Sequence, residues 1–460
     1  MRFEKEIERA VRHQAASDTE TTKTPDEIAL IVENLKGSLS NKQFDFSNST
    51  SLILNQGGNK RFVKRYEDLY SAESVFCQCI KQIVDRVFKI KYSNRNETIK
   101  TLFGILSTIK QMSNFTIVKF DFKDYFNSVS AIYVFEKFIK PKLSDRFETD
   151  LISDFVHKTK YTYAGFSTSN AIAEIIAKQF DIYIRQALMP KGLLYFHRYV
   201  DDSVLIFNEH IDESEIRNIL ELALNEIFHD NTVNTPIKCK SKFKESKFRY
   251  ISKRSISTTP YSIDYLGYEF WFLLNAKNKV EIKYGITEVK RDKYNNRIDK
   301  LISCYTDPNH ADHNNLELLR HRIAGFTSRA VYLNKRFRSN VWKVKGFISN
   351  YGELRYLLET ELLHEETKIF LSNMVEDAFS RASIATPYFL VGAQSTSGYN
   401  LFENMKVNKT ILLVEQIGYD YNSLVKLVAK AGVSSIDSNG KRRGYGTLVR
   451  DYLIKIKIGY

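Results

Sequence analysis

The sequence is poor in cysteine, proline and glycine. Only four cysteines occur among 460 residues, at positions 77, 79, 239 and 304, and they form neither a CxxC pair nor a zinc-finger spacing. This argues against a secreted disulfide scaffold and against a structural zinc site, so we expect reduced, buried thiols. The 7 prolines and 19 glycines are too few for a collagen-like, linker-like or low-complexity chain.

Long hydrophobic runs are also missing. No apolar run approaches the roughly 18 residues that a membrane-spanning helix needs. The first 13 residues lack the apolar core of a signal peptide, and they instead carry Phe3, Ile7 and Val11 at helical spacing. We therefore expect an amphipathic N-terminal helix, no membrane partner and a cytoplasmic location.

What the sequence does have is aromatic content and positive charge. Hydrophobic residues make up 43% and aromatic residues 13%, and a chain of 460 residues is long enough for two or three globular units. The 68 Lys and Arg residues against 54 Asp and Glu give a net charge of +14. Nucleic acid is the first expected partner, before an anionic membrane or a merely solvated basic surface.

Hydrophobic periodicity predicts a mixed sheet that helices cover on one face. Residues 14 to about 60 are polar and predict an irregular approach to the first compact unit. Helices are expected at 66–111 and 170–188 and over most of 285–385, with a further helix at 423–431. Strands are expected at 116–122, 193–200, 203–207 and 409–414, and a strand pair at 261–274.

The strongest local feature is the sequence Tyr199-Val200-Asp201-Asp202 between two predicted strands. Successive side chains of a strand point to opposite faces, so only a turn lets both acids approach one centre. The pattern predicts two acids at the tip of a hairpin. Taken alone, an acidic β-turn without catalytic function explains it equally well.

A third acid, Asp121, ends an apolar predicted strand about 80 residues upstream. Carboxylates on adjacent strands suit magnesium, because hard divalent cations prefer oxygen ligands. Two such ions, about 3.5 to 4 Å apart, can activate an attacking hydroxyl and stabilise a leaving pyrophosphate. The three acids therefore predict nucleotidyl transfer with two Mg²⁺ ions.

A glycine-containing loop, Ala164 to Asn170, leads into the predicted helix between these strands. Glycine there would allow close approach by a base pair or a nucleotide, whereas an ordinary helix-capping loop is the alternative.

In order and spacing, these segments resemble the motifs of the reverse transcriptase family. Motif A is similar to Phe120–Phe126, motif B to Gly165–Asn170 and motif C to Arg198–Asp202; the primer grip that follows is similar to Asp264–Tyr268. The resemblance covers about residues 60 to 275. It implies an α+β fold, a right-hand polymerase with fingers and a ferredoxin-like palm, followed by a mostly helical thumb-like domain. The implied divisions are an extension (1–60), fingers (61–115), palm (116–280) and the C-terminal domain (281–460).

The resemblance also implies roles for individual residues. Asp121, Asp201 and Asp202 would be the catalytic metal ligands, together with the backbone carbonyl of Phe122. Phe126 would crowd a ribose 2′-hydroxyl and so favour deoxynucleotides. The remaining implied roles are nucleotide binding by Arg95, Lys100, Gly165 and Ser169, primer contact by Leu266 and Gly267, and protonation of the leaving group by Lys238, Lys240 or Lys242.

Some features depart from the common family pattern. Ala164 stands where many members carry a glutamine that touches the nucleotide or template, so nucleotide selection is expected to be unusual. The chain has no RNase H pattern, no zinc-binding tail and no Val-Thr-Gly thumb element. The segment Phe166–Glu174 and the long helical extension after the palm resemble the bacterial abortive-infection and defence-associated reverse transcriptases. That subgroup implies antiphage defence, an RNA template or none, a DNA product and oligomerisation, with a tyrosine as one alternative primer.

A cationic segment in the C-terminal part gives an independent indication of nucleic-acid contact. Phe337 and Trp342 are interleaved with Lys335, Arg336, Arg338, Lys343 and Lys345. Such a pattern combines phosphate neutralisation with stacking surfaces. An amphipathic helix with solvated cations is the alternative.

Three further readings remain open at this point. The first is an RNA-dependent RNA polymerase, which Phe126 and the Tyr199-Val200 pair disfavour. The second is untemplated or protein-primed DNA synthesis by the same site. The third is a catalytically silent nucleic-acid-binding scaffold, which the retention of three mutually repelling carboxylates disfavours.

Overall fold

The computed structural model describes residues 2–18, 23–56, 59–336, 339–390, 398–437 and 439–457. The fold is α+β, and its sheets are antiparallel except where β13 (Thr410–Leu413) joins β11 (Arg329–Arg336) in parallel. None of the helices in these ranges is long and apolar enough to cross a membrane. The chain divides into two compact units: unit 1 is Met1–Tyr265 with Leu273–Val280, and unit 2 is Leu266–Phe272 with Glu281–Tyr460.

Unit 1 is built around a five-stranded antiparallel sheet. The strands are ordered β4-β5-β3-β6, and β7 pairs with β3 beside β6. The main elements of unit 1 are, in chain order, α1 (Arg2–Ser17), α2 (Pro25–Ser40), β1 (Thr50–Gln56), β2 (Asn59–Arg65), α3 (Ala72–Phe88), α4 (Arg95–Ile109), β3 (Thr116–Lys123), α5 (Tyr125–Ser128), α6 (Ala131–Val134), α7 (Arg146–Thr159), α8 (Ser169–Leu188), β4 (Leu193–Tyr199), β5 (Asp202–Phe207), α9 (Glu213–Phe228), β6 (Lys242–Phe243), β7 (Arg249–Ser252) and β8 (Tyr261–Tyr265).

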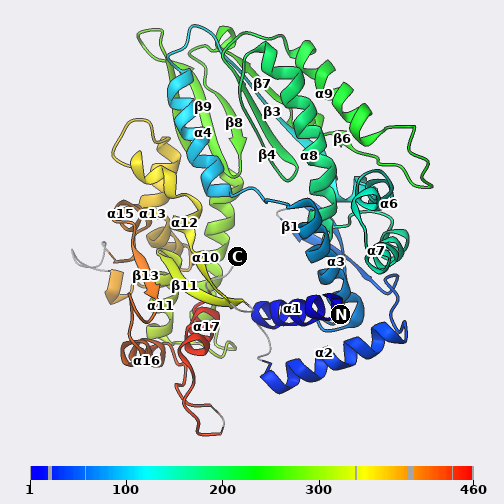
Figure 1. The fold of residues 1–460 in the computed structure, drawn as a ribbon. Helices are drawn as coiled ribbons and strands as arrows, with labels where there is room; N and C mark the ends of the chain where they lie inside the picture. The colour runs from blue at the N-terminus through cyan, green and yellow to red at the C-terminus, as the bar shows by residue number, and fades with distance from the viewer. Residues whose placement is uncertain are drawn as a thin grey trace. The chain divides into compact units, whose positions relative to one another are not determined.

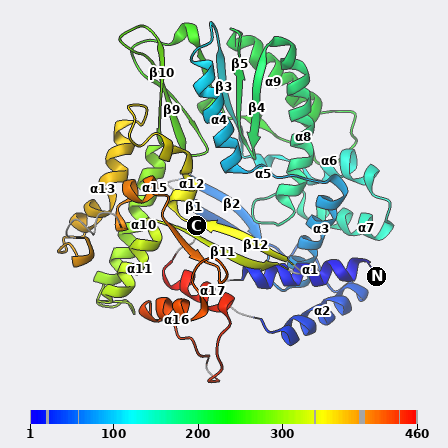
Figure 2. The ribbon, with the colours of Figure 1, turned by 60° about the vertical axis from the view of Figure 1, so that its left-hand side comes forward.

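Helices α8 and α9 cover one face of this sheet (Figure 2). Phe120 and Phe122 of β3 point to that face, where their rings meet Phe180 of α8 at 6.3 and 5.4 Å. Phe228 of α9 lies 5.6 Å from Phe122. The predicted apolar stripe of α8, from Ile172 to Ile184, is buried here, so the expected cover of helices on one face is confirmed. The expected mixed sheet is wrong, because β4, β5, β3, β6 and β7 pair only in antiparallel directions.

The N-terminal part corrects one expectation. The described part of residues 14–60 is not irregular throughout, because it contains α2, β1 and the start of β2, which pairs antiparallel with β1. Helix α2 begins with a capping box, in which Thr24 and Glu27 bond each other's backbone N–H groups, and Pro25 occupies its first turn. The expected amphipathic helix α1 is confirmed, since Phe3, Ile7 and Val11 are buried in the core that α1 shares with α3.

Unit 2 combines helices with a small sheet. β9 (Tyr268–Leu274) and β10 (Val280–Ile286) pair with each other. The other main elements of unit 2 are α10 (Glu288–Thr306), α11 (Leu316–Phe326), β11, β12 (Ser339–Lys345), α12 (Phe347–Asn350), α13 (Glu365–Arg381), α15 (Leu401–Lys406), β13, α16 (Tyr421–Lys430) and α17 (Tyr445–Lys455). The expected strand at 409–414 and helix at 423–431 are present as β13 and α16.

A second correction concerns the cationic C-terminal segment. Residues 329–336 and 339–345, expected within a mostly helical stretch, form the paired strands β11 and β12, which join β13 in a three-stranded sheet of order β12-β11-β13. The reason is visible in the sequence, because Val341, Trp342 and Val344 are β-branched or aromatic residues that favour an extended strand.

Candidate active site

Asp201 and Asp202 lie at the tip of a tight hairpin, as predicted. β4 ends at Tyr199 and β5 begins at Asp202, so Val200 and Asp201 form a two-residue turn. Val200 has a φ of 60°, which a β-branched residue rarely adopts, whereas the positive-φ residues do not include Asp201. This combination matches the II′ class of hairpin turn, and it places the strain at the residue before the acids.

A buried arginine supports this strained turn. The side chain of Arg198 is only 1% exposed, and its guanidinium forms ion pairs at 2.9 Å with Glu174 and with Asp181, both on α8. The same guanidinium donates a 2.8 Å hydrogen bond to the carbonyl oxygen of Val200. Helix α8 therefore fixes the hairpin tip through one side chain.

Asp121 is brought to the same tip by the β3–β5 pairing. Its Cα is the register partner of the Cα of Asp202, and the N–H of Phe122 donates to the carbonyl oxygen of Asp201 at 3.1 Å. Register partners project to the same face of a sheet. Asp121 and Asp202 thus emerge on the face opposite to Phe120, away from α8 and α9.

Burial and mutual repulsion raise the proton affinity of these carboxylates. The pKa of Asp121 is raised to about 6, mainly by burial and secondly by the Asp201 carboxylate. Burial also raises the pKa of Asp201, and it raises that of Asp202 to about 7. Such shifts indicate acids that lack a sufficient counter-charge, and they are common at functional sites.

The main cation among these acids is Lys119, which sequence reasoning did not single out. Lys119 is 1% exposed, and its Nζ lies 3.3 Å from Asp202 Oδ1 and 3.3 Å from Asp264 Oδ1 on β8. Lys247 also approaches Asp264, at 3.5 Å. Although burial acts in the opposite direction, Lys119 and Lys247 together lower the pKa of Asp264. Lys119 therefore connects the hairpin tip to β8.

The donor atoms of this cluster suit a hard divalent cation. Asp121 and Asp201 supply carboxylate oxygens, and the buried Asp202 Oδ1 makes no hydrogen bond to the described residues, although its ion-pair partner Lys119 Nζ lies 3.3 Å away. The same part of the chain holds no group of three or more His, Cys, Asp or Glu side chains arranged as a ready metal site. Two Mg²⁺ ions, with Phe122 as a backbone ligand, stay a prediction that the donor chemistry fits.

The β1–β2 hairpin reaches the glycine loop before α8. Lys64 N donates to the carbonyl oxygen of Ala164 at 2.8 Å. Gly165 has a φ of 108°, and a Cβ there would lie 2.2 Å from the carbonyl oxygen of Lys64. Glycine is required at this position because β2 packs directly on the loop. The close approach expected for a nucleotide is thus made by the protein's own backbone.

The same hairpin provides a cation that the sequence analysis missed. Arg61 of β2 is exposed and lowers the pKa of Asp201, although burial outweighs it. The predicted triphosphate ligands Arg95 and Lys100 lie on α4, which packs on β4 through a 3.0 Å contact between Thr98 and His197. Their role stays a prediction. The signal for Arg61 was present in the basic run before residue 66, but an irregular segment was expected there.

Phe126 and Ser169 lie in well-packed positions. Phe126 is in α5, five residues after Asp121, and its ring lies 5.4 Å from that of Tyr125. Tyr125 in turn donates to the carbonyl oxygen of Ala173 on α8 at 3.0 Å. Ser169 is buried, and its hydroxyl donates to the carbonyl oxygen of Tyr163. This hydrogen bond gives Ser169 a role in the loop that needs no nucleotide.

Leu266 and Gly267 form the turn that follows β8. Both have positive φ, 52° and 84°, as a type I′ hairpin turn requires. Within unit 2, a Cβ on Gly267 would lie 3.1 Å from Tyr351 Oη and 3.2 Å from the Lys290 side chain. The turn is therefore tightly seated, and its proposed contact with a primer stays a prediction.

The structure places each candidate for leaving-group protonation. Lys238 Nζ donates to the carbonyl oxygen of Val233, Lys240 Nζ lies 5.4 Å from the centre of the Tyr161 ring, and Lys242 is in β6. Lys244, which was not considered, donates its backbone N–H to the carbonyl oxygen of Asp121 at 2.8 Å and lowers the pKa of that acid.

Of the predicted nucleic-acid contacts, Lys343 and Lys345 lie on β12. Lys335 and Arg336 are the last two residues of β11, and Arg338 lies outside the described residues.

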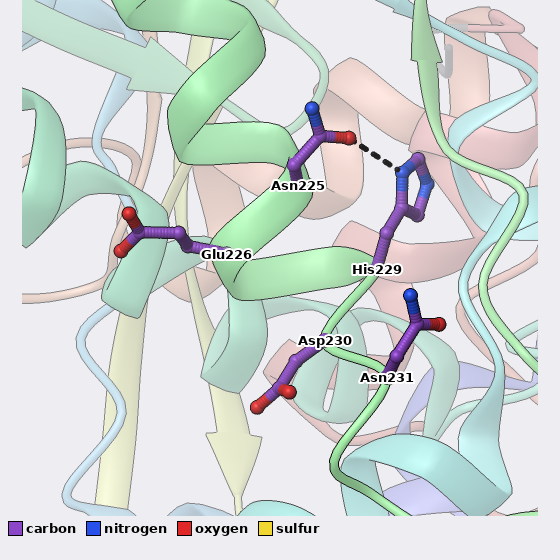
Figure 3. A pocket seen from close by; sticks show the side chains of 5 residues that line it. All are labelled: Asn225, Glu226, His229, Asp230 and Asn231. Carbon is purple, nitrogen blue, oxygen red and sulfur yellow. Dashed lines mark hydrogen bonds between the residues drawn. The ribbon is translucent and has the colours of Figure 1, made fainter.

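A separate pocket of about 520 Å³ lies at the end of α9 (Figure 3). Asn225, Glu226, His229, Asp230 and Asn231 line it, and His229 Nδ1 is 3.3 Å from Asn225 Oδ1. It is open and polar, and it contains none of the predicted site residues.

No model of a known protein family matches this chain, and a search of curated proteins finds no significant match.

Proposed function

We propose that this protein is a DNA polymerase of the reverse transcriptase type, which adds deoxynucleotides by two-metal nucleotidyl transfer. The observation that carries the proposal is the meeting of Asp121 with the Asp201-Asp202 hairpin tip on one face of the unit 1 sheet. Three partly buried acids with raised pKa values are costly unless they bind something positive.

The order of elements also supports the proposal. Unit 1 follows the β-α-β-β-α-β pattern of ferredoxin-like sheets, with the elements β3, α8, β4, β5, α9 and β7 in chain order. The order of these strands in the sheet is β4-β5-β3-β7. Under this proposal the sheet is the palm, and the β1–β2 hairpin with α3 and α4 belongs to the fingers. Unit 2 would then contain the thumb-like part.

The proposed reaction joins a primer 3′-oxygen to the α-phosphorus of a deoxynucleoside triphosphate and releases pyrophosphate. Asp121 and Asp201 would hold Mg²⁺, which would supply activation of the attacking hydroxyl and stabilisation of the leaving group. Arg61 would neutralise phosphate charge beside Asp201. Phe126 would exclude the 2′-hydroxyl of ribonucleotides. Lys244, next to Asp121, joins the earlier lysine candidates for protonating pyrophosphate.

Incorporation of labelled deoxynucleotides on an RNA template with Mg²⁺ tests the proposal. The double change Asp201→Ala and Asp202→Ala should reduce incorporation to background. Asp150→Ala, at a side chain that is 71% exposed on α7, is the matched control and should retain full activity. Persistent synthesis by the double variant would contradict the assignment.

Sugar selectivity is tested by comparing ribonucleotide with deoxynucleotide incorporation. Phe126→Ala should raise ribonucleotide use relative to deoxynucleotide use; unchanged selectivity would remove the steric argument. Preference of the parent protein for ribonucleotides would instead favour an RNA polymerase.

Sequencing the nucleic acid that purifies with the protein separates RNA-templated synthesis from untemplated or protein-primed synthesis. Salt-sensitive RNA binding without any incorporation would favour a silent scaffold.

A role in antiphage defence is part of the same proposal. It rests on the resemblance of Phe166–Glu174 and the long C-terminal part to defence-associated reverse transcriptases. Protection of a bacterial host by the parent protein, lost in the double variant, is the expected result in a phage challenge.

A further inference from the structure

The β11–β12 hairpin of unit 2 has two different faces. In its register Leu333 pairs with Trp342 and Val331 with Val344, so these four side chains share one face. Ala330 and Tyr332 project to the other face, where Leu413 of β13 also lies. We call the face with Val331, Leu333, Trp342 and Val344 the outer face.

The inner face anchors the hairpin in unit 2. Ala330 and Leu413 are buried in a core with Leu424 of α16 and Leu448 of α17, and Tyr332 packs against that core. β13, α16 and α17 gather beside β11 in Figure 1. The outer face therefore belongs to strands whose other face packs on the core of unit 2, and not to a loop.

The outer face leaves large apolar groups exposed to solvent. Trp342 is 54% exposed and Val344 is 48% exposed, and β12 forms the edge of its sheet. One of only two tryptophans in the chain is thus exposed on this face of the hairpin. A cluster of this kind usually marks a binding surface.

The charge of the hairpin limits the choice of partner. From Arg329 to Lys345 the sequence contains six Lys and Arg residues and no Asp or Glu. This composition favours a polyanion and disfavours pairing with a second copy of the same hairpin. An exposed indole within a cationic strand pair suits unpaired bases, which can stack, better than a duplex, whose bases are already stacked.

We propose that the outer face of the β11–β12 hairpin binds single-stranded nucleic acid, with a base stacked on Trp342. The inference deepens the proposed function, on which its partner class rests, by naming the strand form that unit 2 holds. The binding test needs no catalysis. Binding by this face can therefore be absent while polymerase activity is present, and it can be present while polymerase activity is absent.

Tryptophan fluorescence gives a direct test. The other tryptophan, Trp271, stacks on His364 with ring centres 4.9 Å apart, and Trp271→Phe would leave Trp342 as the sole indole. The full-length variant, checked by circular dichroism, is titrated in EDTA with a 20-nucleotide oligothymidylate. We expect quenching of Trp342 emission by the single strand, none by inorganic polyphosphate and much less by a duplex.

Affinity measurements on the otherwise unchanged chain provide the second arm. Trp342→Ala should weaken oligothymidylate binding about 5- to 100-fold, the range expected for one stacked base. Tyr356→Ala, at an aromatic that is 63% exposed in the same unit, is the matched control and should change affinity less than about 2-fold.

Four results would overturn the inference. They are oligothymidylate binding with unchanged Trp342 emission, equal affinity of the Trp342→Ala variant, a blue shift caused by anionic vesicles but not by nucleic acid, and an emission change that depends only on protein concentration. The last two would assign the face to a membrane and to a second copy of the chain.

Discussion

At the scale of single residues, the candidate site depends on how buried charges are balanced. Lys119 touches both Asp202 and Asp264, yet the acids of the site still have raised pKa values. The partner of Lys119 could not be predicted from sequence, and the basic run that contains Arg61 did not show that this cation would act on Asp201. Lys119 and Asp264 are 145 positions apart, and only the tertiary fold brings their side chains together.

Removing the central cation should be costly. We expect Lys119→Met to lower the free energy of unfolding by about 2–3 kcal/mol, because Asp202 and Asp264 would lose their shared partner. Lys247→Met is the control: this more exposed lysine also approaches Asp264, and its loss should cost less than about 1 kcal/mol. Urea unfolding at pH 7 measures both, and equal effects would show that Lys119 has no special position.

The raised pKa of Asp121 predicts a pH-dependent stability. The folded chain keeps the Asp121 proton up to about pH 6, whereas the unfolded chain loses it near pH 4. The folded state binds more protons in that window, so this contribution to stability falls as the pH rises through it. In EDTA, Asp121→Asn should be more stable than the parent by about 1 kcal/mol at pH 8, allowing for partial exposure of the group, with no difference near pH 4.

Denaturant titrations at the two pH values check this expectation. Added Mg²⁺ should narrow the difference at pH 8, since a bound cation would stabilise only the parent carboxylate. A stability difference that is the same at both pH values would contradict the buried-charge explanation.

At the scale of elements, local signals predicted the strands of the candidate site but not the N-terminal segment or the cationic hairpin. β3, β5 and α8 have long apolar patterns, and the Val200-Asp201 turn is short, so sequence reasoning located them well. The capping box of Thr24 and Glu27 was readable and predicts α2. β11 and β12 were missed because charged residues interrupt their alternation, and strand pairing, which sequence does not reveal, stabilises them.

The contact between β2 and the loop before α8 gives an element-scale prediction. Gly165→Ala should lower stability by more than about 2 kcal/mol and abolish incorporation, because the new Cβ would push β2 and Arg61 away. Gly104→Ala is the control: Gly104 lies inside α4 with nothing within 4 Å of the added Cβ, so this change should stabilise by about 0.5–1 kcal/mol. Thermal unfolding and the incorporation assay measure the two outcomes.

At the scale of the whole molecule, the chain consists of two compact units, and Leu266–Phe272 belong to the second unit although Leu273–Val280 belong to the first. The boundary at residue 280, which the family resemblance implies, stays a prediction. The interior of the second unit was less predictable, because its small sheet joins β11 to β13, which is more than 70 residues away. Such long-range pairing leaves no local trace in the sequence.

The four buried cysteines allow the opening rate of each unit to be measured separately. Cys77, Cys79 and Cys239 belong to unit 1 and Cys304 to unit 2, and none of these four described thiols is in a disulfide. An alkylating reagent can reach them only when the surrounding core opens, so mass-spectrometric mapping of modification over time yields the opening rate of each unit. Distinct rates for Cys304 and Cys239 would mean that the units open independently, and a single shared rate would mean one cooperative body.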